Sequence, residues 1–541
     1  MTRLRHPADA GDLLLFDGIA PFFAGLPAGE TNWSKVPFAR LERDGVLAPE
    51  RAAAIRSAWD HYLGHMAGLG YSAVAVDDLA HLVSHPWYPA SLRRLLASYR
   101  DLYRDLFATA ARHGIAVFAI SDYCFFNDAI ERHLARTGAS DLDFFDSTFA
   151  AALRDFPSLA GLVLRLGESD GVDVRDHFTS RLSVARPRQA RHAIERLLHT
   201  AERAGATLMV RTWTLGAYPV GDLMWNPRTW DAVFGGLDSP NLVVSLKHGE
   251  ADFFRYLDVN PLLFRGPLRK VVEFQARREY EGMGEFPAFA GWLHERHLAR
   301  LRQGGARLAG CYVIQAGGWA SWSRLAFVAS GSVWNELNTA VIARLWQGVS
   351  CEDAVREWSA ARLPPGAEPD LLLEFLALAD RAIERGLYIR AFAESPAYVR
   401  RVRLPPLLWV FWQDVTATGL IAMLHRFVVR DRAAAVRDGH AAVADVEAMR
   451  RLAPALGLPV DDLDFQLESF RLLARAREIL LGLDSAETWQ AVGRLLPAYR
   501  SRYPDGYRFT LTGRSRPRAG LLAALGFRLV LRRSRRYRLR E

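Results

Sequence analysis

Three carboxylates in this sequence come shortly after short apolar runs: Glu168, Asp252 and Glu279. Apolar runs of four or five residues without alternation are typical of strands that are covered on both faces. In a parallel α/β barrel the loops after the strands meet at one face, so we expect the three acids to surround one cavity. One protonated acid and one or two ionised carboxylates on opposite sides of a glycosidic bond can hydrolyse it with a water molecule.

Basic and aromatic side chains occur at the ends of neighbouring apolar runs. Arg165 lies in the fourth run, Arg211 and Trp213 end the fifth, Lys247 ends the sixth, and Trp319 follows the eighth. Cations suit an anionic group on a sugar, and aromatic faces can stack on a pyranose ring. We therefore expect these five residues to bind the substrate. For any single acid the alternative role is a helix cap or a surface ion pair, and only convergence of the three predicts catalysis.

The elements that would position these residues are eight apolar runs separated mostly by helix-sized segments. The runs are Leu13–Phe16, Ala73–Val76, Ala116–Ile120, Leu162–Leu166, Leu208–Arg211, Leu242–Leu246, Val271–Gln275 and Tyr312–Gln315. Segments such as Ser91–His113 and Arg188–Gly205 have apolar residues at helical spacing and stop at a glycine. Alternating strands and helices pair in parallel, and eight of them close a barrel. The sequence therefore predicts a (β/α)8 TIM barrel over residues 1–338.

Beyond residue 338 the strand signals vanish and the sequence predicts an all-helical domain over residues 339–505. Ser350 with Asp353 has the spacing of a capping box, and long periodic runs follow. Leu407–Leu424 is the most apolar segment, but it contains Gln413 and Asp414, so a core helix is expected rather than a membrane span. The aromatic residues within this segment predict packing or a homodimer face.

The net charge of +9 lies in the C-terminal end of the chain. Residues 514–541 contain ten Arg and one Glu, which gives +9, so residues 1–513 sum to zero. The balanced remainder predicts no nucleic-acid partner. We expect residues 506–541 to form a basic amphipathic tail. Its apolar stretch AGLLAALG between arginines suits the surface of an anionic membrane, and a solvated, mobile end is the alternative.

Cysteine usage and the N-terminus bear on cofactors and location. Cys124, Cys311 and Cys351 are scattered, so no disulfide framework and no zinc-type spacing is present in the sequence. We expect neither a metal nor a cofactor. The first apolar run, Leu13–Phe16, is too short for a signal peptide. A cytoplasmic enzyme is expected, peripheral at the inner membrane face if the tail binds lipid.

The residues around Asp252 and Glu279 resemble the signature of the family 67 α-glucuronidases. The matching segments are Asp252-Phe253, Val259-Asn260-Pro261-Leu262, Val272-Glu273-Phe274-Gln275 and Glu279-Tyr280-x-Gly282. The resemblance implies that Asp252 and Glu279 are general bases, that Glu168 is the general acid, and that Arg211 and Lys247 bind the substrate. It covers the barrel and extends to the helical domain, which that family also has.

The sequence departs from the family pattern at three points. Because barrel-like sequence begins almost at once, we expect no N-terminal sandwich domain of the kind those enzymes have. Leu164 occupies a position where a basic residue is expected, and Arg165 lies one place later, on the opposite side of a strand. Arg278 precedes Glu279 in place of Gln. The acid and base positions are intact, whereas the residues that would recognise a uronic acid are changed.

These features together predict an inverting, exo-acting glycoside hydrolase that resembles an α-glucuronidase and removes a terminal uronic acid from an oligosaccharide or glycoconjugate. Two carboxylates on the base side, with the acid opposite, imply a single displacement. An inverting glycosidase of the same fold that acts on a neutral or amino sugar is the first alternative. A non-catalytic saccharide-binding protein is the second, although binding alone does not require like charges to be brought together.

Overall fold

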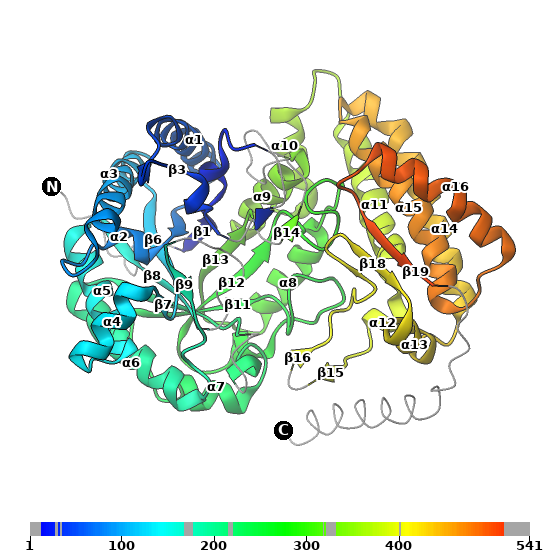
Figure 1. The fold of residues 1–541 in the computed structure, drawn as a ribbon. Helices are drawn as coiled ribbons and strands as arrows, with labels where there is room; N and C mark the ends of the chain where they lie inside the picture. The colour runs from blue at the N-terminus through cyan, green and yellow to red at the C-terminus, as the bar shows by residue number, and fades with distance from the viewer. Residues whose placement is uncertain are drawn as a thin grey trace.

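A computed structural model describes residues 12–27, 31–32, 35–166, 177–214, 220–316, 319–320, 332–399 and 402–512. Its first part is a closed parallel barrel in the strand order β1-β13-β12-β11-β10-β8-β6-β5, which confirms the predicted fold (Figure 1). The strands are β1 (Leu13–Asp17), β5 (Ala73–Asp77), β6 (Ala116–Asp122), β8 (Leu159–Arg165), β10 (Thr207–Arg211), β11 (Leu242–Lys247), β12 (Arg269–Gln275) and β13 (Leu308–Ile314). Each coincides with one of the eight expected runs.

The barrel strands bury both faces, because one face lines the interior and the other packs on the surrounding helices. The interior is filled mainly by small, β-branched and aromatic side chains at alternate positions, among them Leu15, Ala75, Phe118, Val163 and Tyr312. Alternation therefore fixes which residue of each strand points inward at the carboxyl end.

Helices cover the outside of the barrel. They are α1 (Pro49–Gly68), α2 (Leu79–Leu82), α3 (Ala90–Arg112), α4 (Asp128–Thr137), α5 (Asp141–Asp155), α6 (Pro187–Ala204), α7 (Pro227–Phe234), α8 (Gly291–Gln303) and α9 (Val333–Trp346). The two helices expected from periodicity are α3 and α6. Gly205 ends α6 in the left-handed conformation at φ 65°, as a helix-terminating glycine does.

Short strands also form within the loops of both regions. They are β2 (Thr31–Asn32), β3 (Glu42–Arg43), β4 (Val46–Leu47), β7 (Phe125–Phe126), β9 (Thr179–Ser180), β14 (Trp319–Ala320), β15 (Tyr398–Val399) and β16 (Val402–Arg403). The β7–β9 pair connects the loops that follow β6 and β8, and β14 pairs with β2.

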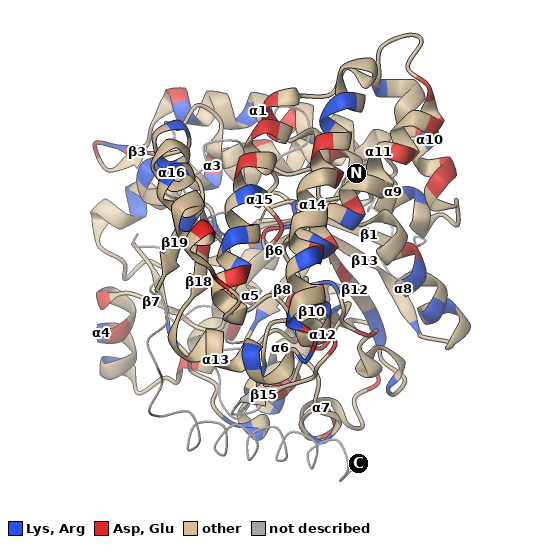
Figure 2. Ribbon diagram, turned by 90° about the vertical axis from the view of Figure 1, so that its right-hand side faces the viewer, with Lys and Arg blue, Asp and Glu red and all other residues tan. Residues whose placement is uncertain are grey.

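The second region is mainly helical, as predicted. Its helices are α10 (Cys351–Arg362), α11 (Pro369–Gly386), α12 (Arg390–Ala393), α13 (Gly419–Val428), α14 (Arg432–Leu452), α15 (Val460–Leu481) and α16 (Ala486–Arg502). The Ser350 hydroxyl accepts from the Asp353 amide at 3.1 Å and so caps α10. Figure 2 shows α14, α15 and α16 side by side in front of the barrel, with Lys and Arg interspersed with Asp and Glu.

The expectation of one core helix over Leu407–Leu424 is wrong. This segment forms a hairpin of β17 (Val410–Phe411) and β18 (Asp414–Ala417), and α13 begins only at Gly419. The polar Gln413-Asp414 pair lies at the turn, and a parallel partner, β19 (Arg508–Leu511), completes a three-stranded sheet. Tertiary pairing with a strand nearly a hundred residues away overrides local helix preference here.

Two further expectations bear on the membrane. The first residues of the expected tail, Arg508–Leu511, are part of this sheet, and residues 513–541 lie outside the described residues. Among the residues that the structure describes, no helix combines the length and apolar character that a membrane span requires.

Candidate active site

Ionisable side chains form a buried layer at the carboxyl end of the barrel. They end or nearly end seven of the strands and share the inward parity of the barrel interior: Asp17, Asp77, Asp122, Arg165, Arg211, Lys247 and Glu273. Carboxylates from β1, β5 and β6 occupy one side, and cations from β8, β10 and β11 occupy the other. Chemistry in this fold collects at this face.

From the cation side, Arg165 contacts two of the aspartates on the carboxylate side. Its Nε lies 2.7 Å from Asp122 Oδ1 and its Nη2 lies 3.8 Å from Asp77 Oδ1. Lys35 forms a second ion pair with Asp122. Burial opposes ionisation of Asp122, but the charges of Arg165 and Lys35 outweigh it and lower its pKa to about 2. Burial dominates at Asp77 and raises its pKa to about 6.

Asp17 lies between these acids and the last barrel strand. Its carboxylate accepts hydrogen bonds from the amides of Gln315 and Ala316, the latter at 3.1 Å, and so joins β1 to the end of β13. Burial raises the pKa of Asp17 to about 6 in spite of these donors. The contact extends the pairing of β1 with β13, which closes the barrel.

Arg211 and Glu273 form a bidentate pair inside the barrel. Arg211 Nε and Nη2 donate to the two oxygens of Glu273 at 2.9 and 2.8 Å, and the Ser245 hydroxyl donates to Oε1 at 2.7 Å. Burial opposes ionisation of Glu273, but Arg211 outweighs it and lowers the pKa of the carboxyl. Paired, planar geometry of this kind is strong and fixes both side chains.

Asp252 is held on both carboxylate oxygens. Oδ1 forms an ion pair with Lys247 and accepts from the Phe253 amide at 3.0 Å. Oδ2 accepts from the Tyr280 hydroxyl at 2.9 Å. Lys247 lies between two aromatic faces, with Nζ 3.6 Å from the ring centroid of Trp213 and 4.4 Å from that of Phe253. These donors and the cation stabilise Asp252 as an anion.

Glu279 is the electrostatic neighbour of Asp252. Its Oε1 accepts from Gln275 Nε2 at 2.9 Å, and its amide donates to Gln275 Oε1 at 2.9 Å, so Gln275 holds the residue at both ends. Burial and then the charge of Asp252 raise the pKa of Glu279 to about 7, against the opposing charge of Lys247. When only one of the two carboxyls is protonated, the proton therefore resides on Glu279.

A pH dependence follows from this arrangement. If Glu279 acts as a base, kcat/KM should rise with pH until Glu279 is ionised at about pH 7, and Glu279→Gln should remove that limb. Because the folded pKa is raised, the group stabilises the fold at acid pH, and this contribution is lost as the pH rises towards 7. A pH–rate profile checks the prediction. A profile that is flat between roughly pH 5.5 and 8 would contradict it.

Backbone strain is concentrated near these two acids. Five described residues other than glycine have positive φ, and four of them lie around the site: Tyr256, Arg278, Met283 and Trp412. Such conformations cost free energy and persist where the surroundings require them, often at functional sites. Arg278, which replaces the expected Gln, pairs with Glu281. Its Nε donates to Oε2 at 3.0 Å and its Nη2 donates to Oε1 at 2.6 Å.

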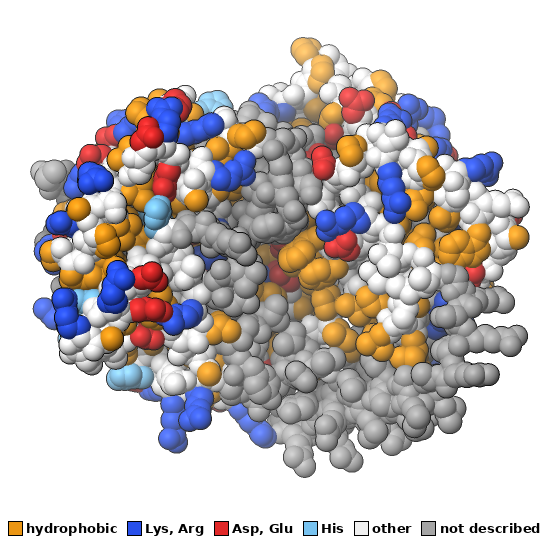
Figure 3. All heavy atoms as spheres, in the orientation of Figure 1, with side chains coloured by type: hydrophobic (Ala, Val, Ile, Leu, Met, Phe, Trp, Pro, Cys, Tyr) orange, Lys and Arg blue, Asp and Glu red, His pale blue; other side chains and the backbone are white. Residues whose placement is uncertain are grey.

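The second region contacts the loop that carries Asp252. The Tyr398 hydroxyl donates to Glu250 Oε2 at 2.5 Å, and Arg403 Nη1 lies 3.2 Å from the same oxygen. Tyr388 OH accepts from the Arg255 amide at 3.1 Å and donates to Glu281 at 2.7 Å. Figure 3 shows hydrophobic side chains gathered along the boundary between the barrel and the second region, beside β18.

Six of the eight site residues expected from the sequence lie around this face of the barrel: Arg165, Arg211, Trp213, Lys247, Asp252 and Glu279. Arg165 points inward and Leu164 packs outside the barrel, so the expectation that Leu164 occupies the position facing the site, with Arg165 on the opposite side of the strand, is wrong. Glu168 lies outside the described residues. Trp319 is described only as a backbone position, in β14, where it pairs with Asn32.

Sequence reasoning gave no site role to six polar residues of the site, although the last three stand in the segments that resemble the family signature: Asp17, Asp77, Asp122, Glu273, Gln275 and Tyr280. Three of them end apolar runs, in LLLFD, AVAVD and AVFAISD, so the rule that found Asp252 could have found them. Glu273 and Gln275 lie inside an apolar run, where only the barrel geometry reveals that they point inward.

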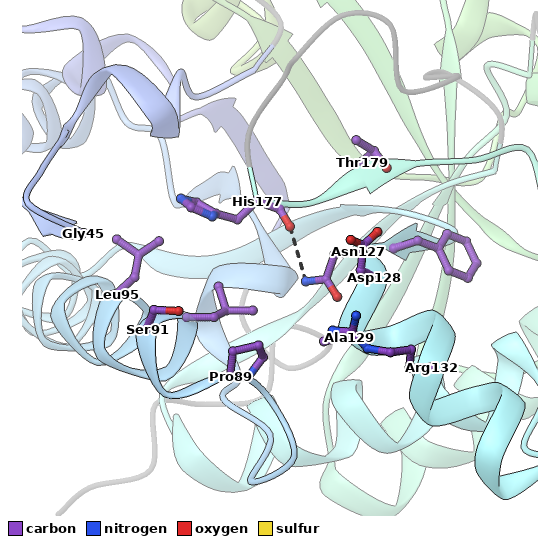
Figure 4. Close-up of a pocket in the computed structure, with 12 residues that line it drawn as sticks. Gly45, Pro89, Ser91, Leu95, Asn127, Asp128, Ala129, Arg132, His177 and Thr179 are labelled. Carbon is purple, nitrogen blue, oxygen red and sulfur yellow. Dashed lines mark hydrogen bonds between the residues drawn. The ribbon is translucent and has the colours of Figure 1, made fainter.

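A surface cavity of about 490 Å³ lies at a different place, between the N-terminal ends of α3 and α4 and the strand β9 (Figure 4). Its described lining includes Ser91, Asn127, Arg132, His177 and Thr179, and none of the candidate acids. Within the described part of the chain, no group of three or more His, Cys, Asp or Glu side chains is placed to hold a metal ion.

Comparisons with known proteins support the fold. No protein-family model matches the chain, and no curated protein matches it. A GH138 enzyme targeting pectin rhamnogalacturonan II is 12% identical with a TM-score of 0.52, and the match covers 91% of this chain and 62% of that one. This chain thus spans under two thirds of that enzyme. At this identity the likeness shows the barrel fold alone.

Two further solved structures are similar at lower scores. A GH20 catalytic module of the pneumococcal exo-β-D-N-acetylglucosaminidase StrH is 11% identical, with a TM-score of 0.37 and coverage of 69% of this chain and 92% of that one. The family 1 β-glucosidase from Thermotoga maritima is 12% identical, with a TM-score of 0.32 and coverage of 61% and 97%.

Proposed function

We propose that this protein is an inverting, exo-acting glycoside hydrolase in which Asp252 and Glu279 activate water and Glu168 protonates the leaving oxygen. The observation that carries the proposal is the pair of buried, interacting carboxyls in the loops after β11 and β12: Asp252 contacts Lys247 and the Tyr280 hydroxyl, and Glu279 has a pKa raised to about 7. Bringing two such groups together costs free energy, which a protein that only binds saccharide has no reason to spend.

The sugar that we propose, following the resemblance to α-glucuronidases, is a terminal uronic acid of an oligosaccharide or glycoconjugate. Lys247, Arg211 and Arg165 are the cations that could face its carboxylate. Each of them already contacts a carboxylate of the protein: Asp252, Glu273 and Asp122. This pairing favours a neutral or amino sugar as the second candidate, because an added anion would have to share a cation that is already neutralised.

One experiment tests both the mechanism and the sugar. Matched aryl glycosides that differ only in a carboxylate or a hydroxymethyl group are hydrolysed, and proton NMR identifies the anomer formed first. We expect inversion, because two carboxyls on the base side leave room for one water and form no covalent intermediate. Retention would contradict the mechanism. Equal kcat/KM for the charged and neutral members would favour the second candidate.

The remaining expectations stay proposals. Residues 514–541 would bind an anionic membrane surface through arginines that flank an apolar stretch, at about 1 kcal/mol for each basic residue near the lipid. A homodimer would use the second region. We also propose that the protein is located in the cytoplasm, or at the inner membrane face if the tail binds lipid.

A further inference from the structure

The β17–β18 hairpin of the second region contacts Tyr280, which is hydrogen-bonded to the candidate base Asp252. The ring of Trp412 is stacked over that of Tyr280, with 6.2 Å between centroids and 8° between planes. The Phe411 ring is 5.2 Å from the same tyrosine. Tyr280 is buried, and its hydroxyl donates to Asp252 Oδ2. A residue of the second region is thus one side chain away from the candidate base.

Trp412 occupies a backbone position that its side chain disfavours. Its φ is 51°, in the left-handed region, at the turn between β17 and β18. Asn and Gly adopt this conformation readily and dominate such turns, whereas for a bulky residue the conformation costs free energy. The hairpin fold alone therefore gives no reason for Trp at this position. The contact between the indole and the ring of Tyr280 provides such a reason.

We propose that Tyr280 is a positioning residue for Asp252, that Trp412 keeps Tyr280 in place, and that the second region is therefore part of the active site. This inference rests on the proposed function. The hydroxyl of Tyr280 is the donor to Oδ2, while Lys247 and the Phe253 amide serve Oδ1. With both oxygens engaged, the carboxylate plane is fixed and the anion is favoured.

The consequence concerns how the two carboxyls share a proton. While Asp252 is held as an anion, the remaining proton resides on Glu279, whose own contacts are to Gln275. Removing the Tyr280 hydroxyl takes a donor from the ionised form of Asp252 and leaves the packing of the ring. Part of the remaining proton then moves from Glu279 to Asp252, whose ionised form has lost a donor, and this added protonated state shifts the last titration of the pair to higher pH.

The test compares Tyr280→Phe and Trp412→Asn with the parent and with Asp414→Asn. Asp414 is in the same hairpin, but it is exposed and pairs with Arg508 on the surface, so its variant controls for disturbance of the hairpin. For Tyr280→Phe we expect kcat to fall roughly 10-fold to 100-fold with little change in KM, and the acid limb of the pH–rate profile to move up by roughly half a unit to one unit.

Trp412→Asn separates a positioning role from a structural one. Asn relieves the backbone strain, so the melting temperature should not fall much, yet kcat should fall and the acid limb should shift in the same direction as in Tyr280→Phe. A variant that melts much lower with unchanged kcat would mean that Trp412 only packs, and would overturn its assignment. Asp414→Asn should behave as the parent in all three measurements.

A measurement without substrate keeps the inference distinct from the proposed function. Carboxyl-13C labelling of Asp and Glu reports the titration of Asp252 and Glu279 directly, assigned with Asp252→Asn and Glu279→Gln. An upward shift of this titration in Tyr280→Phe supports the positioning role even if no glycoside is hydrolysed. Identical titration curves in the parent and in Tyr280→Phe would overturn it even if the protein proves to be a glycosidase.

Discussion

Asp252→Asn should lower kcat/KM by about 1,000-fold, because the amide cannot take the proton that a general base removes from water. The change is isosteric, and the side-chain oxygen can still accept from Lys247 and from the Phe253 amide, so the fold should be kept. The loss should be similar for a substrate with a good leaving group and for one with a poor one, since leaving-group protonation is not the step that is impaired. Steady-state kinetics on both substrates measure it.

A matched control is available on the same loop. Asp258 lies six residues further along, is exposed at 77% of its side-chain surface, and makes only a surface ion pair with Arg300 at 3.4 Å. Asp258→Asn should retain activity within about twofold, because exposed ion pairs contribute little. A comparable loss in both variants would mean that the loop and not the Asp252 carboxylate is required. A loss confined to substrates with a poor leaving group would make Asp252 an acid.

Glu273→Met should destabilise the fold by about 3 to 5 kcal/mol, the usual result of removing one partner from a buried ion pair. Glu273 is 1% exposed and accepts hydrogen bonds from Nε and Nη2 of Arg211 at 2.9 and 2.8 Å. The substitution keeps the side-chain volume, so the cost comes from leaving the guanidinium charge without its carboxylate. Denaturant unfolding of parent and variant, followed by fluorescence and circular dichroism, measures the change.

Two companion variants identify the cause of this loss. Glu273→Met combined with Arg211→Met removes both charges and should recover much of the stability, because a buried pair replaced by apolar side chains is often neutral. Asp231→Asn breaks the exposed pair with Arg265 and should cost less than about 1 kcal/mol. If the double variant is less stable than Glu273→Met alone, the unpaired charge of Arg211 is not the cause of the destabilisation in Glu273→Met.

The barrel and the mainly helical character of the second region were determined by local sequence. Each barrel strand is a short run of apolar residues, and each run needs no knowledge of its neighbours to be recognised. The first run, LLLF, has the least support in the sequence and still forms β1. The exception is Leu407–Leu424, where pairing of β18 with the distant β19 decided the structure.

The candidate site likewise has features that the sequence predicted and features that it did not. Because the loop end of each strand is fixed once the barrel is known, the sequence predicted that Asp252, Glu279 and three cations would meet at one face. It could not predict their partners, since Arg211 with Glu273 and Lys247 with Asp252 depend on which side chains point inward.

What only the tertiary structure decided is how the second region completes the site. Trp412 is 132 residues from Tyr280 in the sequence, and Tyr398 is 148 residues from Glu250. Neither spacing carries a periodic signal, because contacts between segments far apart in the sequence depend on tertiary packing and not on local pattern. Sequence alone thus determined the barrel and the ends of its strands, and packing of the second region determined what surrounds the candidate base.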